Sequence, residues 1–229
     1  MKRVAITGAS GLIGTLLVPS LRDYKVSRLS LPWSDLRRYA TARRALARQD
    51  VVIHLAWNMA EENIFTQSCS AENTAIFFNI YKAAVENRVR RVIVASSVHV
   101  DDFHNWNGPG LITVDKLPAP DSMYGAHKLF LEAVGQQYSR MGLEVVCLRL
   151  GGVQRNNLPP THSLTENAVF LSHEDCISLV KCAIDAPLIP HGFAIIHGVS
   201  DSANRIHDTA NSLGWRPTGQ KEECKVFSA

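Results

Sequence analysis

One stretch near the N-terminus decides the fold: Val4-Ala5-Ile6-Thr7-Gly8-Ala9-Ser10-Gly11-Leu12-Ile13-Gly14. Its apolar start is typical of a buried strand, and a helix-periodic segment follows it to about Leu21. A strand, a glycine turn and a helix form the context in which a glycine motif binds a dinucleotide. In such a turn Gly8 permits the tight bend, Gly11 lets the backbone approach the pyrophosphate, and Gly14 lets the helix pack on the strand. The stretch therefore predicts a dinucleotide site.

Strand and helix patterns alternate along the rest of the chain. Apolar runs predict further strands at 25–31, 50–56, 91–95, 142–150 and 193–199. Helices are expected from Ser34 or Asp35 to about Arg48, over 73–87 and 124–141, after an N-cap at Ser172, and ending at 213–217. This alternation predicts an α/β protein with a Rossmann-type, doubly wound parallel sheet. We expect residues 1–152 to form the dinucleotide-binding core and residues 153–229 to form a small substrate-binding region packed on the same domain.

The end of the second predicted strand departs from the usual dinucleotide pattern. That strand commonly ends in an acidic residue that binds the adenosine ribose. Here it ends in Ser30-Leu31, with Arg28 just before. The missing carboxylate removes a determinant of NAD. Arg28 either holds the 2′-phosphate of NADP or points to solvent, and the sequence leaves both open.

Two further stretches carry catalytic chemistry. Tyr124 and Lys128 are one helical turn apart and share a helix face. A neighbouring ammonium favours the phenolate, so we expect a lowered pKa for Tyr124, which suits proton transfer with an oxygen on carbon. Ser97 stands at the carboxyl end of a strand, where doubly wound sheets bind ligands, and is predicted to be catalytic. A long loop over 101–121 is expected to border the site.

The bulk composition excludes several functions. The net charge of the 229 residues is +3, too small to indicate a nucleic-acid partner. No apolar run reaches the ~18 residues of a membrane span, and the start of the chain leaves no room for a signal peptide, so we expect a cytoplasmic protein. The five cysteines include no C-x-x-C pair. They are interpreted as reduced packing residues, and no metal site is expected.

The glycine turn, Ser96-Ser97 and Tyr124-x-x-x-Lys128, in that order, resemble the extended short-chain dehydrogenases/reductases, the family of sugar-nucleotide epimerases and dehydratases. Asn73 and the closing 213–217 fit the same family, and the resemblance covers essentially the whole chain. Within the family the chain is similar to the uronate dehydrogenases, through the stretches 95–99, 120–125, 149–152, 170–175 and 197–203.

The resemblance implies NAD or NADP as cofactor and assigns roles to particular residues. The catalytic residues would be Ser97, Tyr124 and Lys128. The cofactor would contact Gly8, Ser10, Gly11, Leu12 and Ile13 at the pyrophosphate, Asp35 and Leu36 at the adenine, Leu55 and Ala56 at the ribose, and also Gly14, Arg28, Asn73, Tyr124 and Lys128. The substrate would contact Ser97, His99, Tyr124 and Thr165. A homodimer is possible by the same resemblance.

Three departures bear on the substrate. The region after the second strand is shorter than the family's, and that strand lacks its acidic end. The uronate dehydrogenases also carry an arginine that holds the substrate carboxylate, where this chain has Leu164-Thr165-Glu166-Asn167. Threonine cannot replace a bidentate guanidinium. The resemblance therefore supports the fold and the catalytic residues but not a uronate substrate.

Three functions follow. The first is an NAD(P)-dependent oxidoreductase that transfers hydride between nicotinamide and a hydroxyl or carbonyl of a small sugar or sugar acid. The second is a sugar-nucleotide epimerase or dehydratase, which needs a larger C-terminal region and cations for the diphosphate; between the strand at 142–150 and Lys181 only Arg155 is available. The third is a non-catalytic NAD(P)-binding regulatory relative, suggested by the shortened second-strand region.

Overall fold

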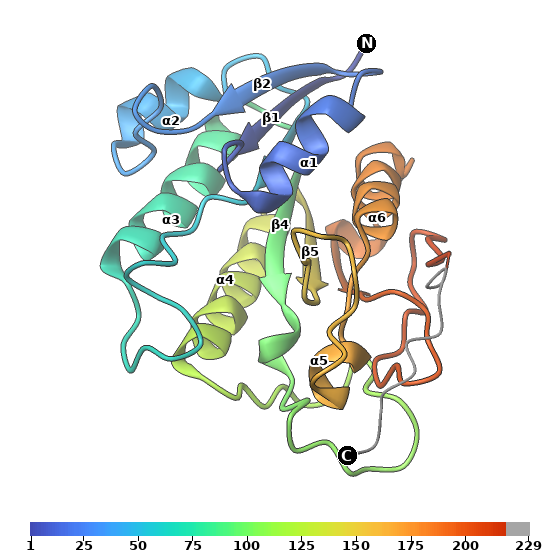
Figure 1. Ribbon diagram of the computed structural model, residues 1–229. Helices are drawn as coiled ribbons and strands as arrows, with labels where there is room; N and C mark the ends of the chain where they lie inside the picture. The colour runs from blue at the N-terminus through green and yellow to red at the C-terminus, as the bar shows by residue number, and fades with distance from the viewer. Residues whose placement is uncertain (219–229) are drawn as a thin grey trace.

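The computed structural model describes residues 1–218, and its centre is one sheet of six parallel strands (Figure 1). The order is β2-β1-β3-β4-β5-β6, so the chain builds outward from β1 in both directions. This confirms the predicted doubly wound α/β fold. The strands are β1 (Arg3–Thr7), β2 (Lys25–Leu29), β3 (Val51–His54), β4 (Arg91–Ser97), β5 (Glu144–Leu150) and β6 (Phe193–Gly198).

The sheet is narrow on the β2 side. A Rossmann sheet commonly has two strands beyond the first on this side. Within residues 1–218 β2 alone stands there, as an edge strand. The shortening seen in the sequence therefore corresponds to the loss of one edge strand, while β1 and its glycine turn keep their place.

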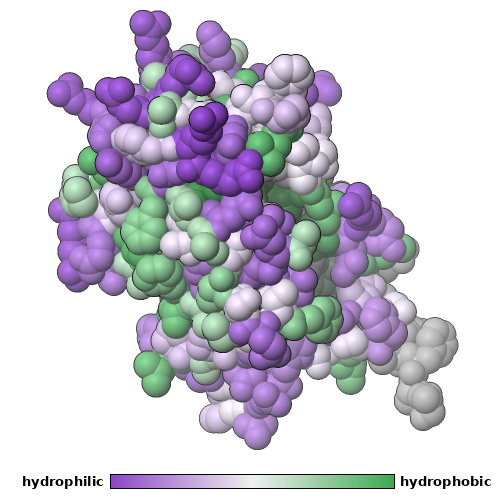
Figure 2. Space-filling view, turned by 90° about the vertical axis from the view of Figure 1, so that its left-hand side faces the viewer, coloured by the Kyte–Doolittle hydropathy of each residue, from purple (hydrophilic) through white to green (hydrophobic). Residues whose placement is uncertain are grey.

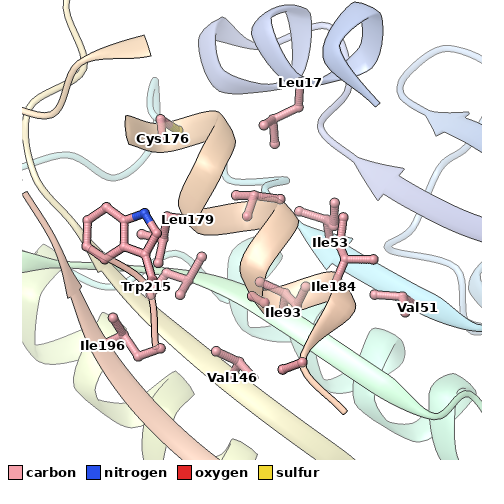
Figure 3. Close-up of a cluster of buried hydrophobic side chains, with 14 of the residues drawn as sticks. Leu17, Val51, Ile53, Ile93, Val146, Cys176, Leu179, Ile184, Ile196 and Trp215 are labelled. Carbon is pink, nitrogen blue, oxygen red and sulfur yellow. The ribbon is translucent and has the colours of Figure 1, made fainter. Parts of the chain in front are cut away.

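Helices cover both faces of the sheet. They are α1 (Leu12–Ser20), α2 (Tyr39–Ala45), α3 (Ala71–Glu86), α4 (Met123–Ser139), α5 (Leu164–Ala168) and α6 (His173–Asp185), with short 3-10 turns η1 (Val98–Val100) and η2 (Pro190–Gly192). Leu17 of α1, Leu179 of α6 and Ile53 of β3 belong to one buried cluster on one face of the sheet (Figure 3). Phe77 of α3 and Leu131 of α4 pack in the core of the other face. None of the helices in residues 1–218 has the length and apolar content needed to cross a bilayer.

Serine side chains cap the N-termini of α4, which carries site residues, and of α6. Ser122 accepts a hydrogen bond from the Gly125 amide and so fixes the start of α4, one residue before Met123. Ser172 accepts from the Asp175 amide in the same way, as predicted. Such caps satisfy amides that the first helical turn leaves free.

Two predicted helix boundaries are wrong. The helix expected from Ser34 or Asp35 begins only at Tyr39, because the Asp35 carboxylate bonds the side chain of Arg37 (2.7 Å) and does not cap the helix. No helix ends at 213–217, since 199–218 contains none. There Asn211 Oδ1 accepts from the amides of Leu213 and Trp215 (3.0 and 3.2 Å), a local turn that competes with helix formation.

Candidate active site

The carboxyl ends of the strands open into two adjoining cavities. The cavity beside β2 has a volume of about 370 Å³, and we call it the β2-side cavity. The second, of about 530 Å³, contains Tyr124 and Lys128, and we call it the catalytic cavity. The residues lining both are Gly8, Gly11, Leu55 and Trp57. The pair therefore forms one continuous groove across the switch point of the sheet, the place where doubly wound proteins bind ligands.

The glycine turn at the junction is shaped for a pyrophosphate. Gly8 has φ +66°, and a Cβ there would lie 2.8 Å from the Ala56 nitrogen. Gly11 is the N-cap of α1 without a side-chain cap, so amides of the first turn stay available to a ligand. The residues of this turn that were predicted to bind the cofactor all line one cavity or both: Gly8, Ser10, Gly11, Leu12, Ile13 and Gly14. The turn fits a dinucleotide cofactor.

The β2-side cavity matches the expected adenosine end with one exception. Its lining includes the predicted residues Asp35, Leu36, Leu55 and Ala56. Arg28 is exposed and lies outside the lining, because neighbouring strand residues face opposite sides and Leu29 takes the cavity side.

A different arginine lies where Arg28 was expected. Arg37 lines the cavity, held by Asp35 at 2.7 Å and by Glu72 at 3.5 Å. Ser30 occupies the place of the usual acidic residue, and its hydroxyl accepts from the Ser10 amide (3.1 Å). Among the described residues that line this cavity, Arg37 is therefore the one cationic side chain.

Ser97, Tyr124 and Lys128 meet in the catalytic cavity. Ser97 ends β4, and its side chain lies close enough to Tyr124 to lower the pKa of that phenol. Lys128, one turn along α4, donates to the Ala95 carbonyl at 2.9 Å, and its nitrogen lies 5.5 Å from the centre of the Tyr124 ring. The same nitrogen lies 3.6 Å from the centre of the Trp57 ring. The backbone thus assembles the three side chains that the sequence predicted to be catalytic.

The ionisation of these groups differs from the expectation. Burial raises the pKa of Tyr124 to about 12, while the hydrogen bond from Ser97 opposes the rise. Burial also lowers the pKa of Lys128 to about 7, although the carboxylates of Glu62 and Glu132 oppose that shift. The expected lowering of the Tyr124 pKa by Lys128 is wrong, because desolvation disfavours the charged forms of both side chains. The raised pKa of Tyr124 favours the protonated phenol.

His99 stands beside the tyrosine. Its ring centre lies 5.8 Å from that of Tyr124, and it lines the catalytic cavity as predicted. Its Nδ1 lies 2.8 Å from the Asp121 carboxylate, so Nε2 is left for a ligand in the cavity.

Phe103 and His104, from the long loop 101–121, line the same cavity. Asp121 was missed in the sequence, where its position just before Ser122 and the Tyr124 motif was the available signal.

Two residues expected at the site lie outside it. Thr165 is absent from the lining, and the adjacent Glu166 lines the cavity in its place, 3.1 Å from His162. Asn73 is buried and lines neither cavity; its Oδ1 accepts from the Asn58 amide at 2.7 Å, which ties down the irregular segment 58–70. Asn73 therefore supports the site instead of contacting it.

A glycine turn at the switch point, joined to a Ser–Tyr–Lys cavity, defines the extended short-chain dehydrogenases/reductases. The sequence pattern of the NAD dependent epimerase/dehydratase family matches residues 4–163, and the chain belongs to that family. It is 30% identical to L-arabinose 1-dehydrogenase (NAD(P)(+)) of Haloferax volcanii, over 95% of this chain and 96% of that one. It is also 30% identical to uronate dehydrogenase of Pseudomonas syringae pv. tomato, over 99% of this chain and 84% of that one.

Solved structures agree on the fold. Uronate dehydrogenase from Agrobacterium tumefaciens superposes with a TM-score of 0.77 at 23% identity, covering 99% of this chain and 87% of that one. UDP-galactose 4-epimerase superposes with a TM-score of 0.65 at 21% identity, covering 86% and 77%. Together with the sequence relatives, these matches confirm the predicted family and the predicted class of NAD(P)-dependent oxidoreductases.

Proposed function

We propose that this protein oxidises a hydroxyl of a small neutral sugar and passes the hydride to NAD⁺ or NADP⁺. The observation that carries the proposal is the position of Ser97, Tyr124 and Lys128 in a cavity continuous with the glycine turn. The names of the relatives, L-arabinose 1-dehydrogenase and uronate dehydrogenase, support a sugar as substrate.

The charge of the catalytic cavity favours a neutral sugar over a uronate. Apart from histidines, Lys128 is the single cationic side chain in the cavity lining formed by residues 1–218. Its nitrogen is already engaged by the Ala95 carbonyl and the Trp57 ring. Glu166 adds a carboxylate to the same lining. A uronate carboxylate would meet like charge and no guanidinium, whereas sugar hydroxyls can bond His99 and Gln154.

Size and charge also disfavour a nucleotide sugar. The catalytic cavity of about 530 Å³ has no arginine in its described lining to bind a diphosphate. The chain also covers only 77% of the UDP-galactose 4-epimerase structure. Both observations support the dehydrogenase over the epimerase or dehydratase alternative.

The side chains divide the work as follows. The cofactor, when bound along the glycine turn, supplies the hydride acceptor. Ser97 donates a hydrogen bond to the reacting sugar oxygen and holds it beside Tyr124. Tyr124, as phenolate, removes the hydroxyl proton, and the Lys128 ammonium stabilises that phenolate. His99, oriented by Asp121, binds a neighbouring hydroxyl. Because burial raises the pKa of Tyr124 to about 12, deprotonation needs additional positive charge at the site.

The test begins with calorimetric titration of NAD⁺ and NADP⁺ into the purified protein, followed by a screen of aldoses and uronates for reduced cofactor. The proposal expects tight binding of one cofactor and repeated turnover of a neutral aldose. Cofactor binding without turnover of any sugar would support the non-catalytic alternative. Turnover restricted to nucleotide-linked sugars would support the epimerase alternative. Preferential oxidation of uronates would overturn the neutral-sugar assignment.

A homodimer through α3 and α4 extends the proposal. Phe78 and Phe130 are exposed on these helices, with ring centres 6.1 Å apart. In Figure 2 the surface at the height of α2 is mostly hydrophilic, while apolar residues gather lower, at the height of α3 and α4. Light scattering during gel filtration tests this: Phe130→Glu should turn a dimer into a monomer, and a monomeric parent would contradict it.

We also propose a cytoplasmic location. The four cysteines within residues 1–218, namely Cys69, Cys147, Cys176 and Cys182, are all free, which suits a reducing compartment. Cys224 lies outside the described residues. Cell fractionation with an antibody tests the proposal, and recovery in a secreted or membrane fraction would contradict it.

A further inference from the structure

A second polar cluster lies behind the catalytic cavity, formed by Asp101, His197 and His207. Their exposed fractions are 2%, 1% and 0%. They come from two distant parts of the chain: Asp101 directly follows η1, whereas His197 lies in strand β6 and His207 in the segment just after it. His197 Nε2 lies 3.0 Å from Asp101 Oδ2, and His207 Nε2 lies 3.7 Å from the same oxygen. One ligand atom from each residue lies within 4.8 Å of the others.

The histidines are arranged as ligands. His197 Nδ1 lies 3.0 Å from the carbonyl oxygen of Asp208, which can only accept, so Nδ1 carries a hydrogen. In the neutral ring the Nε2 lone pair then points at the cluster. A ring nitrogen that donates to a backbone carbonyl while the other faces inward is typical of metal-binding histidines. Neither ring nitrogen of His207 has a hydrogen-bond partner, although the side chain is fully buried. Such a group is costly to bury without a partner.

The surrounding charges leave room for a cation. Arg149 donates from Nη1 to Asp101 Oδ1 at 2.9 Å. Its Nε and Nη2 donate to the Glu132 carboxylate at 3.0 and 2.8 Å. Arg149 therefore bridges two buried carboxylates, and within the group of Asp101, Glu132 and Arg149 one negative charge remains. A proton on His197 would balance that charge but would leave His207 unpaired. A divalent cation would satisfy Asp101 and both histidines together.

We propose that Asp101, His197 and His207 bind one divalent transition-metal ion, with Zn²⁺ as the best fit. Two imidazoles and one carboxylate are a common ligand set for Zn²⁺. In a tetrahedral site with bonds of this kind the ligand atoms lie about 3.3 Å apart. The observed separations of 3.0 and 3.7 Å from Asp101 Oδ2 need little movement to reach that spacing.

The ion would be structural. It would join loop 101–121, β6 and the chain around His207, whose backbone already pairs with Ile112. Phe103 links this cluster to the substrate side, since its ring centre lies 6.2 Å from that of His207 and 5.1 Å from that of His99. Phe103 also lines the catalytic cavity. The metal would hold Phe103, and with it this side of the catalytic cavity, in place without taking part in hydride transfer.

The test measures metal content and affinity in the full-length protein. The parent is purified without chelator and analysed by mass spectrometry for bound metal, then stripped with EDTA and titrated with Zn²⁺ against a chromophoric chelator. His207→Gln and His197→Gln are compared with Cys69→Ser, which removes a ligand from the separate group Glu62, Cys69 and His127. We expect one equivalent in the parent and in C69S, and an affinity at least about 10- to 100-fold weaker in both histidine variants.

Two results would overturn the proposal. One is the absence of saturable Zn²⁺ binding by the stripped parent, which would leave His197 as a protonated partner of Asp101. The other is unchanged binding by folded His207→Gln. If the histidine variants fail to fold, thermal unfolding of the stripped parent decides: Zn²⁺ must raise its Tm, and an unchanged Tm refutes the site.

Discussion

The Lys128 ammonium nitrogen lies 3.6 Å from the centre of the Trp57 indole ring. Trp57 lines both cavities, and its ring meets Tyr124 and His127 edge-on at 6.0 and 5.0 Å. The indole therefore forms a platform between the adenosine end and the catalytic end of the groove. Its cation–π contact holds the Lys128 ammonium and so fixes the position of that charge relative to Tyr124.

Removing the platform should weaken cofactor binding. In Trp57→Ala the cation–π contact, worth about 0.5–2 kcal/mol, is lost, and we expect cofactor affinity to fall by up to about 30-fold. Trp57→Phe keeps a ring and should lose less. Calorimetry measures the affinities, and tryptophan fluorescence reports the site directly, since quenching by cofactor should disappear in W57F and persist in the control Trp106→Phe. Equal affinities in W57A and the parent would show that the ring does not position Lys128.

Tyr124→Phe tests the proton-transfer role. The variant keeps the ring and its contacts but cannot exchange a proton with the sugar oxygen, so turnover should fall by at least about 10²- to 10⁴-fold. Cofactor affinity by calorimetry should change little. Tyr138→Phe, on the same helix but outside the catalytic cavity, is the matched control. Turnover of Y124F near that of the parent would remove Tyr124 from the mechanism.

Much of this site was predictable because its elements are local. The spacing of Tyr124 and Lys128 fixes a shared helix face, and the glycine turn specifies its own backbone path. Of the two positions that the sequence left open for Arg28, the structure has the exposed one, and the burial of its strand neighbour Leu29 agrees with that. The sequence could not decide because charge indicates which residues are able to bind phosphate, whereas the pleat of the strand determines which side chains face the groove.

The remaining features depend on contacts that no local pattern contains. In the sequence Trp57 is an ordinary aromatic residue after a strand. Its contact with Lys128 arises only in the folded protein, where α4 places the Lys128 nitrogen over the indole ring. Asp101 and His197 are 96 residues apart in the sequence, so no local pattern indicated their pairing. The raised pKa of Tyr124 comes from burial, which is a tertiary property. The sequence therefore identified the chemistry of single motifs but not the electrostatics that they share.

The buried ammonium should make stability depend on pH. The pKa of Lys128 is lowered to about 7, against 10.5 when unfolded. Between these values the unfolded chain binds more protons than the folded one, so the free energy of unfolding should rise with pH from about 7 to about 10. Above that, the raised pKa of Tyr124 acts in the opposite sense, because the unfolded phenol ionises first.

Denaturant unfolding across this pH range, without cofactor, checks the expectation. Lys128→Met removes the titrating group and should flatten the rise, so the difference between parent and variant isolates Lys128. The variant should also be more stable than the parent at pH 7 by about a few kcal/mol, as expected for a buried amine with a shift of this size. Parallel pH curves for the two proteins would show that Lys128 is not desolvated in the folded state.

Glu166→Arg should change the substrate preference. The carboxylate of Glu166 lines the catalytic cavity, in the segment 164–167 where the sequence resemblance to the uronate dehydrogenases implies an arginine. A guanidinium there can form charge-assisted hydrogen bonds with a sugar carboxylate, each worth about 1.5–3 kcal/mol. We expect the kcat/KM for a uronate, relative to a neutral aldose, to rise by about 10- to 100-fold. Glu166→Gln separates the two contributions, since it removes the repulsion without adding an attraction and should shift the ratio only slightly. An unchanged ratio in both variants would mean that Glu166 does not face the reacting sugar, and the argument for a neutral substrate would lose its main support.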